Sequence, residues 1–370
     1  MAREPDPGTP AAVSGPPVSD AGVVGWIDRR TGAREVFAAL LHVRIPIRAM
    51  TFYLGGITLF LFGVQVVTGT LLALYYQPTP ETAYDSVKAI TSGVAFGWLI
   101  RSVHHWAANL MILSLVLHVI RIFFQAAYKY PRELTWLVGA GLLMVTIGFG
   151  FTGYLLPWDQ RAFWATTVGT EIAGSIPLVG DALLQLLRGG ADVTGATLSR
   201  FFGVHVLVLP LSLGALLVIH LAIVHQHGLA DPTRPEPRDP EAVAELRRTE
   251  RLKAFFPDYI LDEVIAWYAV LAVLVILATV FPAGLEAKAD PIETPAHIKP
   301  EWYFLAVYEF LKFVPRIVGI LAPVVALGVL ALLPFLDRNP EVRPRKRPIA
   351  LAIGFMALIV MVVLTAMGFQ

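Results

Sequence analysis

Seven long apolar stretches, separated by segments that hold nearly all of the charged residues, constrain this chain more than any other feature. A bilayer core of about 30 Å requires about 20 apolar residues for one helical crossing. The stretches cover residues 51–76, 101–126, 136–156, 203–225, 262–283, 316–336 and 348–368. Only 15% of the 370 residues are charged, which is too few to cover the surface of a water-soluble domain. The sequence therefore predicts an all-α membrane protein with seven transmembrane helices.

Lysine and arginine concentrate in alternate connecting segments, and this asymmetry predicts an orientation. The N-terminal region, the loop around Lys129 and Arg132, and residues 226–261 and 337–347 are rich in them, whereas 77–100, 157–202 and 284–315 are much poorer. Connections rich in positive charge stay in the cytoplasm. The N-terminus is therefore expected in the cytoplasm and the C-terminus on the opposite, positive side.

The segments outside the spans have predictions of their own. Residues 1–22 are rich in Pro, Gly, Ala and Asp and are predicted to be a disordered tail. Residues 23–48 mix apolar side chains with arginines, which predicts an amphipathic helix on the membrane surface. Short apolar runs within 176–187 predict interfacial helices in a long loop.

Four histidines are placed in two matching pairs. His104 and His118 lie 14 residues apart in the second span, and His205 and His220 lie 15 apart in the fourth. At about 1.5 Å rise per residue the members of each pair are about 21 Å apart along the helix axis, one near each leaflet. Two iron atoms, each with two axial imidazoles, would fit between these helices. Four separate hydrogen-bonded core histidines are the simpler alternative, although histidine in hydrocarbon is usually functional.

Pairs of glycines and flanking arginines support the same interpretation. Gly55 with Gly69, and Gly139 with Gly153, are also 14 residues apart in the first and third spans, and glycine allows a flat porphyrin to approach the backbone closely. Ordinary packing of membrane helices through small residues is the alternative. Two arginines stand one turn outside the histidines of the second span and could pair with haem propionates or extend towards the interface: Arg101 and Arg121.

The chain contains no cysteine. This excludes disulfides, iron–sulfur ligation and thioether-linked haem within it.

Several motifs, in order along the chain, resemble the cytochrome b family of bc-type complexes, and the b6 branch in particular. They are Arg101–His104, His118–Arg121, Pro131–Trp136, Gly153–Gln160 and Lys299–Leu305, the last containing the sequence Pro-Glu-Trp-Tyr. The resemblance runs from about residue 45 to 365. It implies a four-helix haem-binding domain at 49–228, a cytoplasmic linker at 229–261, and a three-helix part at 262–370 similar to the partner subunit of b6 proteins.

The resemblance also implies a function and its cofactors. A low-potential haem b is expected on His104 and His205 near the positive side, and a higher-potential haem b on His118 and His220 near the cytoplasm. Quinol oxidation is expected beside the first haem and quinone reduction beside the second, coupled to proton translocation. The implied partners are a Rieske iron–sulfur protein, a c-type cytochrome, membrane lipid and a second copy of the complex in a bacterial inner membrane, and no nucleic acid is expected.

Two residues depart from the b6 pattern. Tyr53 stands where b6-type proteins carry the cysteine that attaches an extra haem, so both haems are expected to be non-covalent. His225 follows His220 by five residues, as in mitochondrial-type proteins, and is expected to contact quinone, although a polar residue facing lipid headgroups is an equal alternative.

Glu301 is the expected proton acceptor for quinol oxidation, because a carboxylate among Pro300, Trp302 and Tyr303 is partly desolvated and its pKa is raised. Tyr154 and Tyr303 are expected to line the pocket. Four charged residues at the cytoplasmic end are possible proton-handling groups, although a solvated charged face is the favoured alternative for each: Arg251, Lys253, Asp262 and Glu263.

Two other classes of function were considered. A transporter could use buried histidines as a proton relay, but it needs no pairs at matched depths. A membrane anchor for a soluble dehydrogenase would also hold two haems, but it leaves Lys299–Leu305 and the second half of the chain unexplained.

Overall fold

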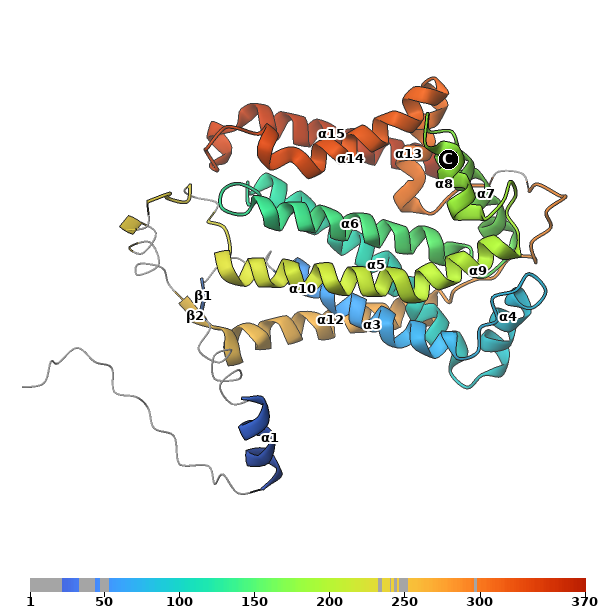
Figure 1. Ribbon diagram of the computed structural model, residues 1–370, viewed down its shortest axis with the longest axis horizontal. Coiled ribbons are helices and arrows are strands. Elements are labelled where there is room, and N and C mark those ends of the chain that lie inside the picture. The colour runs from blue at the N-terminus through green and yellow to red at the C-terminus, as the bar shows by residue number, and fades with distance from the viewer. Residues whose placement is uncertain are drawn as a thin grey trace, which may run out of the picture. The chain divides into compact units, whose positions relative to one another are not determined.

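The computed structural model describes residues 22–32, 44–46, 53–231, 235–239, 241–242, 245, 252–295 and 298–370. Among these residues, seven helical spans are long and apolar enough to cross a membrane, which confirms the predicted fold class (Figure 1). Their helices are α3 (Leu54–Ala73), α5 (Gly97–Phe124), α6 (Glu133–Tyr154), α10 (Leu209–His227), α12 (Ile260–Val280), α14 (Arg316–Leu336) and α15 (Pro348–Phe369). The only strands in this part of the chain are β1 (Arg44–Pro46) and β2 (Leu252–Ala254), which pair with each other.

The described residues fall into two compact units, one of residues up to 45 together with 252–261, and one of residues 46–251 together with 262–370. The small unit contains α1 (Val23–Thr31), which lies within the surface helix predicted for 23–48. Residues 33–43 and 47–48 of that prediction lie outside the described residues, and Arg44–Pro46 form a strand instead. Helix α1 ends at Gly32, whose φ of 62° is the left-handed conformation that terminates many helices. The tail predicted for 1–22 lies outside the described residues except for Gly22.

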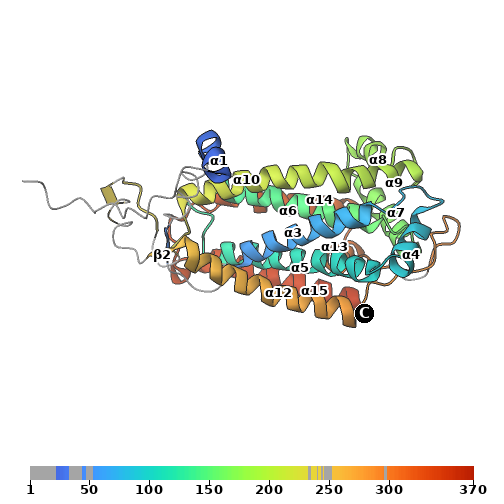
Figure 2. The ribbon, with the colours of Figure 1, turned by 90° about the horizontal axis from the view of Figure 1, so that it is seen from below.

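In the large unit, α3 packs against α5, α6 against α10, α14 against α6, and α13 (Trp302–Phe313) against α15. Figures 1 and 2 both show α3, α5, α6, α10 and α12 running alongside one another. Apolar residues from these five helices form a buried layer in the middle of the bundle: Leu61, Ala107, Met111, Leu142, Leu213 and Leu274. Because lipid is as apolar as these side chains, close packing rather than exclusion of water holds such a layer together.

Short helices gather at one end of the bundle, which we call the loop end (Figures 1 and 2). They are α4 (Ala83–Gly93), α7 (Gln160–Gly174), α8 (Gly180–Arg188) and α9 (Gly195–Gly203). Local capping explains two of their starts: the Asp159 side chain accepts from the Ala162 N–H at 2.9 Å, and Thr194 caps α9. Helix α8 matches the apolar run predicted at 176–187, whereas α4, α7, α9 and α13 were not predicted.

A π-helical turn, Val204–Val208, joins α9 to α10 and contains His205. A π turn accommodates one more residue than an α turn. It therefore compensates for the 15-residue spacing of His205 and His220, so that both can face α5. Pro210 follows directly, and its ring cannot pack against the carbonyl four residues earlier in a regular α-helix.

A polar cluster joins the α5–α6 connection to the α14–α15 connection. The Tyr128 hydroxyl donates to Asp337 and accepts from the Arg347 guanidinium at 2.7 Å, and the Lys129 ammonium lies 3.0 Å from Asp337. The Arg347 side chain is fully buried. This Tyr128 cluster links the first four spans to the last two through residues that lie outside the linker between them.

Candidate functional site

The four predicted histidines lie on two helices, α5 and α10 with its π turn, and each faces one of the four predicted glycines. A Cβ built on Gly69 would lie 3.1 Å from the His104 ring, and one on Gly153 would lie 2.5 Å from the His205 ring. The equivalent distance is 3.4 Å for two further pairs: Gly55 with His118, and Gly139 with His220. The structure thus brings all eight residues into two groups, on α3, α5, α6 and α10.

The rings of His104 and His205 face each other near the loop end. Their centroids are 6.4 Å apart, and their planes are inclined by 72°. Metal–imidazole bonds are about 2 Å long, so two imidazoles on opposite sides of one metal ion have ring centres about 6 Å apart. This spacing, and the glycine backbones that leave room for a flat ring beside the imidazoles, fit a haem whose iron would be held by His104 and His205.

Threonine hydroxyls contact the inner nitrogens of this pair. Thr68 Oγ1 lies 2.9 Å from His104 Nδ1, and Thr152 Oγ1 lies 3.1 Å from His205 Nδ1. A ligand histidine commonly uses its other nitrogen in such a contact, which orients the ring. Neither threonine was singled out from the sequence.

The other pair, His118 and His220, lies further along the same two helices, where the rings meet Gly55 of α3 and Gly139 of α6. Within the described residues, the Nδ1 atoms of both rings are buried and have no side-chain hydrogen-bond partner. Beside this pair, Glu263 of α12 is only 5% exposed, and a Cβ at Gly56 would overlap its carboxylate. The solvated face favoured for Glu263 from sequence is therefore wrong, because the close approach of α3 and α12 at Gly56 buries the side chain.

Tyr53 stands immediately before α3 and donates to Asp262 at 2.7 Å. Burial, together with this hydrogen bond, raises the pKa of Tyr53 to about 12. The phenol therefore remains a neutral donor at ordinary pH.

The flanking polar residues take different positions. Arg101 donates to the carbonyl oxygen of Ala283 at 2.8 Å and also to that of Gly284, so it holds the segment that follows α12. Arg121 donates to Gln125 at 3.0 Å in the last turn of α5. His225 is exposed in the last turn of α10.

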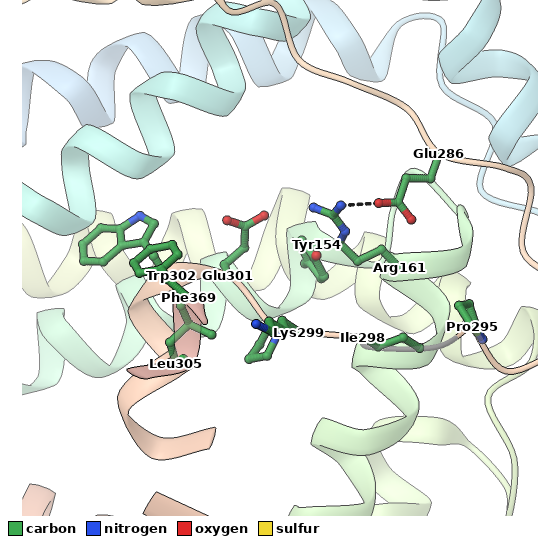
Figure 3. Close-up of a pocket in the computed structure, with 12 residues that line it drawn as sticks. Tyr154, Arg161, Glu286, Pro295, Ile298, Lys299, Glu301, Trp302, Leu305 and Phe369 are labelled. Carbon is green, nitrogen blue, oxygen red and sulfur yellow. Dashed lines mark ion pairs between the residues drawn. The ribbon is translucent and has the colours of Figure 1, made fainter. Parts of the chain in front are cut away.

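A cavity of about 530 Å³ opens at the loop end (Figure 3). Figure 3 shows Glu301, Tyr154 and Arg161 near one another along it, with Arg161 paired to Glu286. Its other lining residues come from the segment before α13, from α13 itself and from the end of α15: Pro295, Ile298, Lys299, Pro300, Trp302, Leu305, Gly368 and Phe369.

Glu301 is the N-cap residue of α13, yet its side chain makes no capping hydrogen bond and lines the cavity instead. Burial raises the pKa of its carboxyl group, while the positive charge of Arg161 partly opposes this shift. Trp302, the next residue, donates from Nε1 to Asn109 of α5 at 2.8 Å. The Glu301 carboxylate is thus held at the cavity because the first turn of α13 is hydrogen-bonded to α5 through Trp302 and Asn109.

The last turn of α6 connects the cavity to the His104–His205 pair. Gly153 faces His205, and its neighbour Tyr154 lines the cavity. The Tyr154 hydroxyl is buried and has no hydrogen-bond partner among the described residues, as expected of a group that meets a ligand. Tyr303, which was expected to line the pocket, is not among the lining residues of this cavity and packs instead on Gly150, where a Cβ would lie 3.0 Å from its ring. Burial together with the charge of Glu301 raises the pKa of Tyr303.

Sequence reasoning missed Arg161 and Glu286 as cavity residues. Arg161 carried a signal, because it directly follows the Gly153–Gln160 motif in a segment that is poor in basic residues. Glu286 carried no such signal in the sequence. The segment after α12 reaches the cavity because its backbone pairs with the start of α7, where the Gln160 N–H donates to the Ala287 carbonyl oxygen at 2.9 Å.

Comparison with known proteins identifies the family to which this arrangement belongs. Residues 42–228 match the sequence profile of the family described as Cytochrome b/b6/petB, and residues 288–370 match that of Cytochrome b(C-terminal)/b6/petD. The chain belongs to the cytochrome b/b6 family. It is 40% identical over 344 residues to the cytochrome bc complex cytochrome b subunit of Chlorobaculum thiosulfatiphilum, covering 91% of this chain and 78% of that protein.

Two further cytochrome b relatives define the extent of the likeness. Cytochrome b6 of Heliobacterium mobile is 46% identical over 212 residues, which cover 56% of this chain and all of that protein. A solved structure described as a hyperthermophilic respiratory Complex III superposes with a TM-score of 0.83 at 34% identity, covering 94% of this chain and 91% of that one. The chain is therefore a cytochrome b subunit of a bc-type complex, which transfers electrons as part of a quinol oxidoreductase.

Proposed function

We propose that this cytochrome b oxidises quinol in the loop-end cavity and transfers electrons through two non-covalent b haems to a quinone reduction site at the opposite end. His104 and His205 hold the haem nearer the cavity, and His118 and His220 hold the other. The observation that carries this proposal is the facing pair of rings, 6.4 Å apart, one turn of α6 away from a cavity that contains a partly desolvated carboxylate.

The four glycines support the haem assignment. Each removes the Cβ that would otherwise occupy the space next to a histidine ring, and the closest of them, Gly153, leaves no room for a side chain. Haem bound between these rings would supply one-electron transfer, and the protein controls its potential through the histidines and their surroundings. Arg101 and Arg121 stand towards the two ends of α5 and would be the residues that pair with the propionates, which for Arg101 means exchanging its bonds to the carbonyl oxygens of Ala283 and Gly284.

Quinol oxidation releases two protons and two electrons. Glu301 accepts a proton from a quinol hydroxyl, and its raised pKa brings the carboxylate closer to the basicity that this transfer needs. Tyr154 lines the pocket, and its hydroxyl, which has no hydrogen-bond partner among the described residues, would hydrogen-bond an oxygen of the quinol. Tyr303, two residues after Glu301, would support the pocket from its packing on Gly150. A haem held by His104 and His205 would supply the acceptor for one of the two electrons, and a partner outside the chain would take the other.

Quinone reduction takes place at the end where His118, His220 and Glu263 lie. Gly55 faces His118, and the adjacent Gly56 faces the Glu263 carboxylate, so one turn of α3 contacts both the haem ligand and a buried acid. Glu263 is placed to deliver protons to the reduced quinone, and His225, exposed at the end of α10, contacts the quinone from the rim.

The complex is proposed to include a Rieske iron–sulfur protein and a c-type cytochrome, to be a homodimer, and to lie in a bacterial inner membrane with the N-terminus in the cytoplasm. In this orientation the loop end is on the positive side, so quinol oxidation releases protons there and quinone reduction takes them up from the cytoplasm. The haem-binding part comprises 49–228, the linker 229–261 and the C-terminal part 262–370.

A redox-titrated visible spectrum of the purified complex tests the proposal, together with a pyridine haemochrome assay and a haem-stained denaturing gel of this chain. We expect two b-type haems per chain, two separated midpoint potentials and no stain on the denatured band. A chain without haem would disprove the assignment, and a stained band would show that the interpretation of Tyr53 is wrong.

A further inference from the structure

The two histidine pairs differ in the partners of their inner nitrogens. In the loop-end pair, both Nδ1 atoms meet a threonine hydroxyl, at 2.9 Å for Thr68 and 3.1 Å for Thr152. In the other pair, no side chain among the described residues is at hydrogen-bond distance from either Nδ1. The glycine pattern is common to both pairs, and the α10 histidine of each pair also has a backbone hydrogen-bond partner, Phe149 for His205 and Thr135 for His220. The difference between the pairs therefore lies in the threonines.

The direction of these hydrogen bonds follows from the proton count of a hydroxyl. Thr68 Oγ1 lies 2.7 Å from the Val64 carbonyl oxygen, and Thr152 Oγ1 lies 2.8 Å from that of Gly148. A hydroxyl has one proton, and a carbonyl oxygen can only accept. Each threonine therefore donates to its own helix and accepts from the histidine, which requires a proton on Nδ1.

This arrangement fixes the tautomer of both rings. With Nδ1 protonated, the free lone pair of His104 and of His205 is on Nε2, which is the nitrogen left to bind a metal. An acceptor on Nδ1–H also increases the electron donation of the ring to the metal. Stronger donation stabilises ferric over ferrous iron and so lowers the reduction potential.

We infer that Thr68 and Thr152 are positioning residues that fix the Nε2-binding tautomer of His104 and His205 and lower the reduction potential of the haem at the loop end relative to the other. The inference rests on the proposed haem assignment and adds the cause of the difference between the two haems. Both threonines are buried, with exposures of 8% and 6%, so water does not compete for the contact.

Redox titration of the purified complex from Thr68→Val and Thr152→Val variants tests this inference. Valine has nearly the shape of threonine but cannot accept from Nδ1–H. We expect the equilibrium constant for reduction of the loop-end haem to rise about tenfold in each variant, which is an increase of about 59 mV for one electron. The component lost in a His205→Leu variant identifies the loop-end haem, and the other component should not move.

Two further variants separate a hydrogen bond from a packing defect. Thr68→Ser and Thr152→Ser keep the hydroxyl and should restore the original potential. Thr146→Val is the matched control, because Thr146 is also buried in α6, donates to the Leu142 carbonyl oxygen at 2.8 Å and contacts no histidine. Electron paramagnetic resonance of the ferric haem gives an independent reading, since ring orientation sets the g-values.

The outcomes are distinct. An unchanged potential in both valine variants would overturn the inference while leaving the haem assignment intact. A potential that rises equally in Thr146→Val, or that serine does not restore, would attribute the effect to packing and would also overturn it. Fewer than two haems in the unsubstituted protein, measured first by pyridine haemochrome, would instead refute the proposed function.

Discussion

The loop end and the opposite end of the bundle carry the same pattern in different surroundings. Each has two histidines, on α5 and α10, and two glycines, on α3 and α6. At the loop end the rings meet threonine hydroxyls, and a cavity lined by Glu301 begins at Tyr154, next to the glycine that faces His205. At the opposite end no threonine hydroxyl of the described residues meets either Nδ1, and α12 brings the buried Glu263 close by. Helix register therefore determines where a cofactor can be held, and residues from the connections and from the last three spans determine the chemistry next to it.

The largest expected effect comes from removing one ligand at each end. His205→Leu and His220→Leu should each reduce the haem content from two to one per chain, and the lost component should be the lower-potential one in the first variant and the higher-potential one in the second. Pyridine haemochrome and redox titration measure both. Loss of the same component in both variants would contradict the division into two separate sites.

Adding a single methyl group sharpens the comparison. A Cβ on Gly153 would be 2.5 Å from the His205 ring, whereas one on Gly139 would be 3.4 Å from the His220 ring, which is ordinary contact. Gly153→Ala should therefore lose most of the loop-end haem, and the Gly139→Ala control should retain most of both haems. Equal haem content in the two variants would show that the closer contact at Gly153 has no consequence.

Changing the charge beside Glu301 should alter the pH dependence of quinol oxidation. The carboxylate is active when ionised, so the rate rises with pH through its raised pKa. The positive charge of Arg161 holds that pKa down. Arg161→Gln should therefore move the rising part of the pH–rate profile to higher pH. The matched control is Lys288→Gln: Lys288 pairs with Asp85 and is not part of the cavity lining. If the pH–rate profile of Arg161→Gln matches that of the unsubstituted protein, Glu301 is excluded as the titrating group.

The smallest expected effect concerns the anchor of α13. Asn109→Leu removes the acceptor for Trp302 Nε1, a bond whose loss costs about 1 kcal/mol. A shift of Trp302 displaces the adjacent Glu301, so the rate of quinol oxidation should fall several-fold while both haem potentials stay unchanged. Steady-state kinetics with a titration of the same preparation checks this, and an unaltered rate would mean that α13 is held by its other contacts.

Much of the fold and the repeated part of the site could be predicted from sequence because both depend on regular periodicity. Span length predicts the seven crossings, and the 14-residue spacing places each histidine and glycine on one face. The 15-residue spacing was harder to interpret, since the π turn at Val204–Val208 absorbs the extra residue, and Pro210 was the available signal.

The remaining features depend on contacts between distant segments. Thr68 and Thr152 resemble the other threonines of the spans, and only the packing of α3 on α5 and of α6 on α10 reveals their histidine partners. Glu263 looks like a charge at the start of a span, and it is buried because Gly56, more than 200 residues away, removes a side chain. Helix α13 begins within the Lys299–Leu305 motif. That motif predicted a pocket, but it did not indicate that Glu301 caps a helix.

The Tyr128 cluster has a consequence for how such a chain can be divided. Tyr128 and Lys129 come before residues 229–251, and Asp337 and Arg347 come after them, yet the four meet through buried hydrogen bonds and ion pairs. A gene cut within residues 232–250 should therefore yield two polypeptides that still assemble in the membrane, and copurification of a tagged first piece with the second would show it. The Heliobacterium mobile cytochrome b6, matched over its whole length by 56% of this chain, is a relative that corresponds to one such piece.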